Sequence, residues 1–210
     1  MFKGIDMSVF QGVPNFALVA KTQQFCYIKV TDGEKYKYQI AKAQATGAQL
    51  NGLKVGYYHF GHPEDTNTTA KAEAEFFVQN ITALGLPAAD LIPAIDVEQV
   101  YAGAEVPVPV GRLYTWLKEF IGRMSELGFP RVMIYSNPAY LNHYLPANHD
   151  LGMYPLWLSE YAQSITIKAN GWPSVSLWQN SEKGQIPGII GNVDLNICED
   201  LSLITFSPAA

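Results

Sequence analysis

Four acidic side chains stand where apolar, strand-like runs of the sequence end. Asp6 lies near the end of the run 2–8, Asp96 and Glu98 end the run 91–98, and Asp194 lies in the run 191–196. A carboxyl group within apolar sequence costs free energy unless it is paired or takes part in chemistry. One such acid commonly makes only a local hydrogen bond to the backbone. Four acids at three strand ends favour a functional site.

Crowded carboxyl groups are typical of enzymes that hydrolyse glycosidic bonds. Side chains alternate along a strand, so Asp96 and Glu98 face one side while Ile95 and Val97 face the other. If the first and eighth strands are neighbours in a closed barrel, the other two acids come together opposite this pair. Like charges in a partly dry cleft raise the pKa of at least one carboxyl group. A carboxyl group that stays protonated near neutral pH can then act as a general acid.

Aromatic and polar side chains stand at the ends of other apolar runs. Flat rings stack on sugars, and phenol, amide and ammonium groups bind hydroxyl and acetamido groups. Strand alternation places Trp157 and Tyr135 toward the mouth of a barrel, and it places Trp178 on the face opposite Gln179. Packing in the core is the alternative for any one ring. The predicted substrate contacts are Tyr58, Lys29, Tyr135, Trp157 and Gln179.

Other chemistries have little support in the sequence. His59 and His62 are the only close histidine pair, but His59 alternates away from Tyr58 and no third ligand stands at a defined spacing, so we expect no metal. Cys26 and Cys198 fit no zinc pattern and are expected to be inert, buried thiols. A GxSxG motif is absent, and no glycine-rich phosphate loop follows a strand, so we expect no cofactor.

The composition indicates a globular protein that does not bind nucleic acid. The 210 residues are 48% hydrophobic and only 16% charged, which excludes a disordered chain. The net charge is -5, and no cluster of lysine or arginine offers a footprint for nucleic acid or anionic lipid.

The elements that must position the acids are eight short apolar runs. They cover 2–8, 25–31, 54–60, 91–98, 131–136, 155–160, 174–179 and 191–196. Helices are predicted at about 35–50, at 67–84 with Asp65 and Thr66 as capping candidates, and at 110–127. The last two gaps, of about 13 and 11 residues, are too short for a comfortable crossover helix.

This pattern predicts an α/β fold, a modified TIM-like (β/α) barrel of eight strands with helices mainly in the first two thirds. A doubly wound open sheet is the alternative fold. We expect a single domain over 1–206 and a short tail at 207–210.

Seven motifs occur along nearly the whole chain in a characteristic order. They are GIDMSVFQG (4–12), IKVTDG (28–33), GYYHF (56–60), AIDVE (94–98), PLWLSEY (155–161), LWQNS (177–181) and VDLN (193–196). In these motifs the chain resembles the glycoside hydrolase family 25 lysozymes, the Chalaropsis-type N-acetylmuramidases of phage endolysins, bacteria and fungi. Two positions depart from the pattern, since Phe16 with Asn15 stands where the family usually has Trp, and Asp32 where Glu is common.

The resemblance implies a modified eight-stranded barrel and cleavage of the β-1,4 bond between N-acetylmuramic acid and N-acetylglucosamine in peptidoglycan. It implies that Glu98 is the general acid, that Asp96 assists the reacting sugar, and that Asp6 and Asp194 complete the acidic cleft. Asp96 either attacks the sugar directly or steadies an acetamido group that attacks its own anomeric carbon. The likeness of the DxE motif to that of substrate-assisted hydrolases favours the acetamido route.

Two other functions remain open at this point. The first is a chitinase-like hydrolase or N-acetylglucosaminidase, which also uses acids at strand ends but releases a different reducing end. The second is a pseudoenzyme that binds peptidoglycan without cutting it.

The sequence also bears on where the protein acts. No apolar run approaches about 18 residues, and the start has no pattern of a secretory signal peptide. We therefore expect a protein that is made in the cytoplasm and does not bind membranes. We also expect it to be a monomer. It would reach the glycan strands of the cell wall through a holin or a secretion system.

Overall fold

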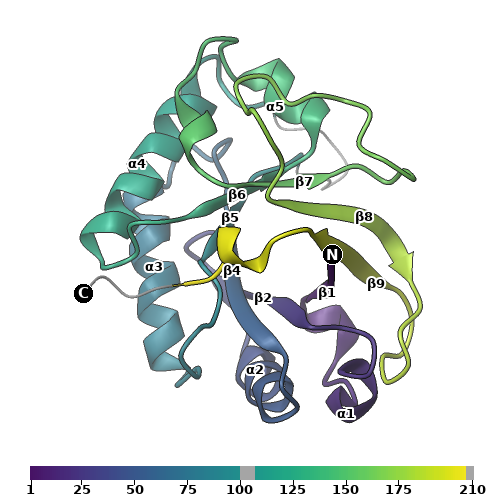
Figure 1. The fold of residues 1–210 in the computed structure, drawn as a ribbon. Coiled ribbons are helices and arrows are strands. Elements are labelled where there is room, and N and C mark those ends of the chain that lie inside the picture. Colours follow the sequence, from purple (N-terminus) through teal and green to yellow (C-terminus); the bar gives the residue numbers. More distant parts are fainter. Residues whose placement is uncertain (100–106, 207–210) are drawn as a thin grey trace.

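The strands of the computed structural model, which describes residues 1–99 and 107–206, close into a barrel (Figure 1). β1 pairs with both β2 and β9, and this closes the ring β1-β2-β4-β5-β6-β7-β8-β9. A short strand, β3 (Tyr36–Lys37), pairs only with β2 and lies outside the ring. The barrel strands are β1 (Phe2–Met7), β2 (Phe25–Asp32), β4 (Lys54–Phe60), β5 (Ala94–Asp96), β6 (Met133–Ser136), β7 (Leu156–Ser159), β8 (Leu177–Gly184) and β9 (Val193–Cys198). The predicted eight-stranded barrel is confirmed.

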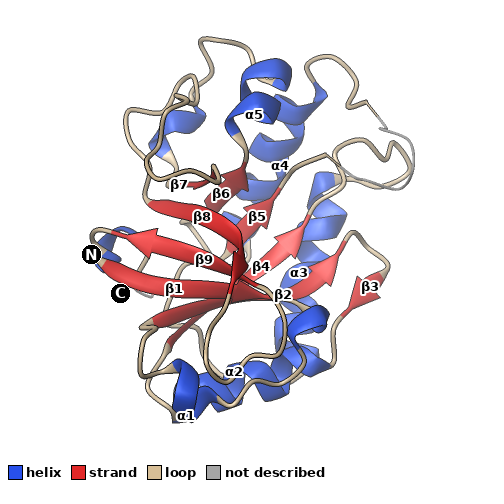
Figure 2. Cartoon of the chain, turned by 90° about the vertical axis from the view of Figure 1, so that its right-hand side faces the viewer, coloured by secondary structure: helices blue, strands red, loops and turns tan. Residues whose placement is uncertain are grey.

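One barrel strand runs against all the others. The pairings from β1 through β2 and β4 to β8 are parallel, whereas β9 is antiparallel to β8 and to β1 (Figure 2). The start of β9 therefore lies at the same edge as the C-terminal ends of the other strands. We call this edge the mouth. Asp194 lies at the mouth because it is the second residue of β9. The prediction that Asp194 stands at the end of a strand is therefore wrong, because the strand begins there.

Five α-helices lie in the described part of the chain, packed around the strands. They are α1 (Phe16–Val19), α2 (Ile40–Leu50), α3 (Ala70–Ala83), α4 (Arg112–Glu126) and α5 (Pro138–Tyr144), with 3₁₀ turns η1 (Val9–Gln11), η2 (Leu151–Met153) and η3 (Leu201–Leu203). None of these helices is long and apolar enough to cross a membrane. As expected, no helix joins β7 to β8 or β8 to β9.

All three predicted helices start later than the sequence suggested, and two of them start later by three residues or more. The 67–84 helix begins at Ala70, because Thr69 is its N-cap and accepts a hydrogen bond from the Ala72 amide at 3.1 Å. Asp65 and Thr66 were therefore the wrong caps. The 35–50 helix begins at Ile40, because residues 36–37 pair with β2 instead. The 110–127 helix is confirmed as α4, which buries Leu113, Trp116 and Phe120 against the barrel.

The core has two layers, as alternation along the strands requires. Residues such as Ile5, Ile28 and Ile95 point outward and pack against the helices. Residues of the other parity, Tyr27 and Trp157 among them, fill the inside of the barrel. The segment ending at Phe206 covers the edge opposite the mouth, where the Ile92 amide donates to the Ile204 carbonyl at 2.8 Å. The interior of the barrel is thus covered at this edge and open at the mouth.

Cys26 and Cys198 are buried free thiols, as the sequence predicted. The predicted tail at 207–210 lies outside the described residues.

Candidate active site

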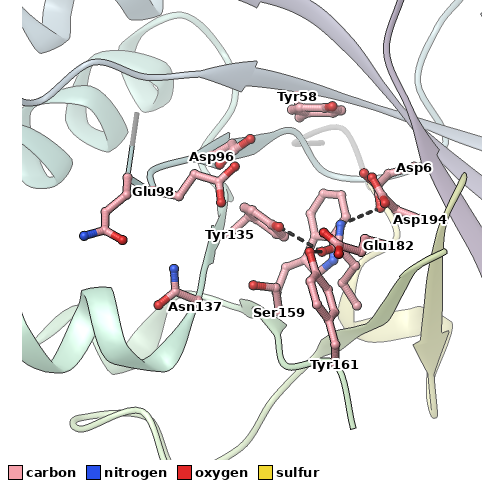
Figure 3. A pocket seen from close by; sticks show the side chains of 13 residues that line it. Asp6, Tyr58, Asp96, Glu98, Tyr135, Asn137, Ser159, Tyr161, Glu182 and Asp194 are labelled. Carbon is pink, nitrogen blue, oxygen red and sulfur yellow. Dashed lines mark hydrogen bonds between the residues drawn. The ribbon is translucent and has the colours of Figure 1, made fainter. Parts of the chain in front are cut away.

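A cavity of about 540 Å³ opens at the mouth of the barrel (Figure 3). All four predicted acids line it, together with four of the five predicted substrate contacts. The full lining is Asp6, Tyr58, Asp96, Glu98, Gln99, Tyr135, Asn137, Trp157, Ser159, Tyr161, Gln179, Glu182 and Asp194. Figure 3 shows Asp6 and Asp194 together on one side and Asp96 and Glu98 on the other.

Asp6 and Asp194 form a pair of carboxyl groups that are hydrogen-bonded to each other. They are opposite each other in the antiparallel pairing of β1 with β9. Burial, and then the charge of Asp6, raises the pKa of Asp194 to about 9, so Asp194 is protonated at neutral pH and donates to Asp6. Burial also raises the pKa of Asp6, but hydrogen bonds from its neighbours oppose this and favour its charged form. The pair therefore carries one proton and one negative charge.

Two amides fix which carboxyl group carries that charge. The amide nitrogens of Gln179 and Asn196 donate to Asp6 Oδ2 at 2.9 and 2.7 Å. Their orientation is set by further donors, because Tyr135 donates to Gln179 Oε1 at 2.9 Å and Trp157 donates to Asn196 Oδ1 at 2.7 Å. An amide whose oxygen accepts these bonds must turn its nitrogen toward Asp6. Asp6 is therefore the ionised partner.

Asp96 and Glu98 form the second pair, positioned by β5 and the residues just after it. The Val97 amide donates to the Tyr135 carbonyl at 3.1 Å, and the Ser136 hydroxyl donates to the Val97 carbonyl at 2.6 Å. These bonds hold Val97 outward, so both acids turn into the cavity as strand alternation predicted.

This second pair also retains a proton near neutral pH. Burial, and then the charge of Glu98, raises the pKa of Asp96 well above its usual range. Burial raises the pKa of Glu98 to about 7, while the positive charge of Lys29 opposes the rise. Asp96 Oδ1 is buried and has no hydrogen-bond partner in the described part of the chain. It is therefore available to a group of the ligand.

Lys29 is the one predicted site residue that does not line the cavity. Its Nζ lies 2.7 Å from Asp32 Oδ2 and 4.2 Å from the centroid of the Phe60 ring. Asp32 thus holds the ammonium group beside the cavity. From there Lys29 acts on Asp96 and Glu98 through its charge and lowers the pKa of both.

Five lining residues were missed by the sequence reasoning, namely Gln99, Asn137, Ser159, Tyr161 and Glu182. Ser159 could have been found, because alternation from Trp157 along β7 places both on the same face. Glu182 could not, because the register of β8 against β9 shifts twice between Gln179 and Gly184 and so breaks the alternation. Trp178 lies outside the lining as predicted, and its ring nitrogen donates to the Glu160 carbonyl at 2.8 Å.

The two neighbouring histidines have separate partners. His59 is fully buried between Thr31 Oγ1 at 2.8 Å and Glu73 Oε2 at 2.9 Å. His62 lies between Asp32 and Glu64. Among the described residues no cluster of histidine, cysteine and acidic side chains could hold a metal ion.

Comparisons with known proteins identify the family of this chain. The family model of glycosyl hydrolases family 25 matches residues 5–189. Lysozyme M1 of Streptomyces globisporus is 29% identical over 197 residues, which cover 92% of this chain and 66% of that protein, so the chain spans somewhat less than two thirds of its length. An N,O-diacetylmuramidase of Arthroderma benhamiae is 28% identical over 89% of this chain and 79% of its own length.

A solved structure shares the fold as well as the sequence pattern. The bacterial lysozyme of Streptomyces coelicolor superposes with a TM-score of 0.83 and 26% identity, covering 95% of this chain and 92% of that one. The family model spans most of the sequence and includes Asp6, Asp96 and Glu98, whereas Asp194 lies beyond the end of the match at residue 189. The chain belongs to the glycosyl hydrolases family 25.

Proposed function

We propose that this chain is a muramidase, which hydrolyses the β-1,4 bond between N-acetylmuramic acid and N-acetylglucosamine in peptidoglycan and so acts on the cell wall. Membership of the family makes the chain a glycoside hydrolase of the lysozyme type. The observation that carries the proposal is the facing arrangement of two proton-retaining carboxyl pairs in one cavity.

Glu98 is the general acid in this proposal. Its raised pKa of about 7 keeps a large share of the carboxyl groups protonated at neutral pH. The proton passes to the glycosidic oxygen as the bond from that oxygen to the anomeric carbon breaks, so the leaving sugar departs as a neutral alcohol. A water molecule then attacks the anomeric carbon, displaces the acetamido or Asp96 oxygen that has bonded to this carbon, and gives a proton to Glu98.

Asp96 assists the reacting sugar. In the acetamido route, its unpartnered Oδ1 accepts the N–H of the sugar's acetamido group, whose oxygen forms a bond to the anomeric carbon. Such a hydrogen bond favours the ionised form of Asp96 and leaves the shared proton on Glu98. In the direct route, a carboxylate oxygen of Asp96 forms that bond instead. The buried, unpartnered oxygen supports the acetamido route.

The pair of Asp6 and Asp194 supplies one fixed negative charge. That charge faces the second carboxyl pair across the cavity (Figure 3). Positive charge develops on the sugar ring in the transition state, and a preorganised anion stabilises it without rearrangement of the protein.

Digestion of purified peptidoglycan by wild type and Glu98→Gln tests this function. Released ends are reduced with borohydride and identified by mass spectrometry. We expect reduced muramic acid from wild type and a rate lower by about 10²- to 10⁴-fold from Glu98→Gln, which is the usual contribution of a general acid. Glu119→Gln on the exposed face of α4 is the matched control and should keep wild-type activity.

The other functions have distinct signatures in the same experiment. Reduced glucosamine ends would indicate a glucosaminidase. Binding to several wall types without release of any ends would indicate a pseudoenzyme. A Glu98→Gln variant as active as wild type would remove Glu98 from the mechanism.

A further inference from the structure

A second cavity adjoins the cleft on the side of Glu98. Its volume is about 370 Å³, and it is lined by Gln99, Asn137, Ala139, Tyr140, His143 and Tyr144. Gln99 and Asn137 line both cavities, so the two cavities adjoin at these residues, next to Glu98. The remaining lining comes from α5, the short helix that follows β6.

Asn137 joins the two cavities and is held in place by the helix. It is the N-cap of α5, and its Oδ1 accepts a hydrogen bond from the Tyr140 amide at 2.8 Å. The oxygen is therefore used by the helix. The amide nitrogen is left as a fixed hydrogen-bond donor where the two cavities meet, and Figure 3 shows Asn137 on the side of the cleft that holds Asp96 and Glu98.

The outer wall of the second cavity is made of aromatic rings that pack against one another at steep angles. Tyr140 is buried, and its ring centroid lies 4.8 Å from that of Tyr144. His143 is exposed and meets Tyr144 edge to face, with ring centroids 4.5 Å apart and an angle of 88° between the rings. Rings held against each other lose little freedom when a ligand packs on them, which suits the apolar face of a sugar.

The charges around this cavity indicate which part of peptidoglycan it fits. Its described lining contains no carboxylate, lysine or arginine. Such a wall offers nothing to pair with the charged groups of a peptide stem, whereas amides, phenols and an imidazole suit the hydroxyl and acetamido groups of a neutral sugar.

We infer that this second cavity binds the sugar on the leaving-group side of the scissile bond, a neutral N-acetylhexosamine of the glycan strand. The inference rests on the proposed function. A general acid stands beside the oxygen that departs, and the sugar whose anomeric carbon reacts occupies the cleft of the four acids. The departing sugar must then extend past Glu98, where Gln99 and Asn137 open into the second cavity.

The test compares two substrates that differ only in what leaves. One is a peptidoglycan tetrasaccharide that releases a disaccharide. The other is the β-glycosyl fluoride of the N-acetylglucosaminyl-N-acetylmuramic acid disaccharide, whose leaving fluoride is too small to contact the second cavity. The measured quantity is the ratio of kcat/KM for the tetrasaccharide to kcat/KM for the glycosyl fluoride. Loss of a contact to the departing sugar lowers this ratio, whereas a general loss of folded enzyme leaves it unchanged.

We expect His143→Ala and Tyr144→Ala each to lower the ratio about fivefold to tenfold, the usual value of an aromatic contact. Phe10→Ala is the control, because this ring is 88% exposed on η1, in the turn that follows β1. Phe10→Ala should keep the wild-type ratio. His143 is exposed, so His143→Ala should fold like wild type. The His143→Ala variant therefore tests the inference even if Tyr144→Ala lowers the melting temperature.

Two results would overturn the inference. One is a wild-type ratio in a folded His143→Ala variant. The other is a lowered ratio in Phe10→Ala alone, which would place the departing strand across the opposite rim. Failure of the muramidase proposal looks different, since wild type itself would then release no muramic acid ends from peptidoglycan.

Discussion

The chemistry at the residue scale depends on where protons reside among four carboxyl groups. Asp194 holds one proton because Asp6 already accepts two amide donors. Glu98 and Asp96 retain another because burial raises the pKa of both. The cleft thus combines a proton donor with an anion although all four groups are chemically alike, and the difference comes only from their neighbours.

Activity should fall as the pH rises through about 7. Glu98 must be protonated to donate, and its pKa is raised to about 7, so the active form is present below that pH and is lost above it. The check is a pH profile of kcat/KM on a soluble glycan. Lys29→Met removes a charge that lowers the pKa of Glu98, so the alkaline limb should move to higher pH. Lys29→Arg should keep the wild-type limb, and an unmoved limb in Lys29→Met would contradict the electrostatic role of Lys29.

Substitutions of the two paired aspartates should have unequal effects. Asp194→Asn keeps a neutral donor to Asp6, so we expect a small loss of activity. Asp6→Asn replaces the charged acceptor of the Gln179 and Asn196 amide nitrogens with a neutral amide oxygen, and a hydrogen bond to a charged group contributes about 1.5–3 kcal/mol against about 0.5–1.5 kcal/mol for a neutral one. Chemical denaturation should therefore show Asp6→Asn to be the less stable variant.

The same pair makes the stability of the fold depend on pH. The pKa of Asp194 is raised from its usual value of 3.8 to about 9, so the folded state binds more protons than the unfolded state between these values. Stability from this group is therefore present at low pH and falls as the pH rises through this window. Asp194→Asn should show a flatter decline of melting temperature from pH 5 to pH 9. An equal decline in both proteins would contradict the assignment of the proton to Asp194.

At the scale of elements, the strands of the barrel make room for large interior rings by means of glycine. A Cβ atom at Gly56 on β4 would overlap the ring of Tyr27 on β2, and one at Gly4 on β1 would overlap the ring of Phe25. The rings fill the barrel below the acids and form the floor of the cleft. Tyr27 is fixed there by a hydrogen bond to the Ile92 carbonyl at 3.0 Å.

Gly56→Ala should therefore destabilise the protein by about 1–3 kcal/mol through overpacking, as measured by urea denaturation. Gly122→Ala on α4 is the matched control, because nothing lies within 4 Å of its added Cβ. An exposed glycine inside a helix costs roughly 0.5–1 kcal/mol relative to alanine, so this variant should be more stable than wild type. Similar effects of the two substitutions would contradict the close packing of Tyr27 on β4.

At the scale of the whole molecule, the barrel is open at the mouth and covered at the other edge. The segment after β9 returns across that edge, where the Phe206 amide donates to the Asp90 carbonyl at 2.9 Å and Arg131 donates to the Leu203 carbonyl at 2.7 Å. Ile204 is fully buried against the interior residues. This cover keeps water from the floor that supports the cleft.

Ile204→Ala should cost about 2–5 kcal/mol, the usual range for a buried isoleucine replaced by alanine. The measurement is the free energy of unfolding. Leu203→Ala is the control, because Leu203 lies in the same turn and is 43% exposed. A loss no larger than that of the control would mean that the segment does not seal the barrel.

Much of this protein can be predicted from its sequence because the signals are local. Apolar runs marked the strands, and alternation correctly turned Asp96, Glu98 and Trp157 into the interior and Trp178 away from the cleft. The three- and four-residue spacing of α4 gave its bounds within two residues. These patterns depend only on the periods of a helix and a strand, which every short segment carries by itself.

Only the tertiary structure decided the direction of β9, the partner of Lys29 and the position of Glu182. The sequence shows that the gaps before β8 and before β9 are both short, yet β8 is parallel to β7 whereas β9 is antiparallel to β8 and so brings Asp194 to the mouth at its start. Lys29 is held beside the cleft because Asp32 competes for its ammonium group. A shifted register in β8 places Glu182 in the lining. Each of these outcomes depends on a neighbour far along the chain or on the pairing of two strands, and a local pattern carries no information about either.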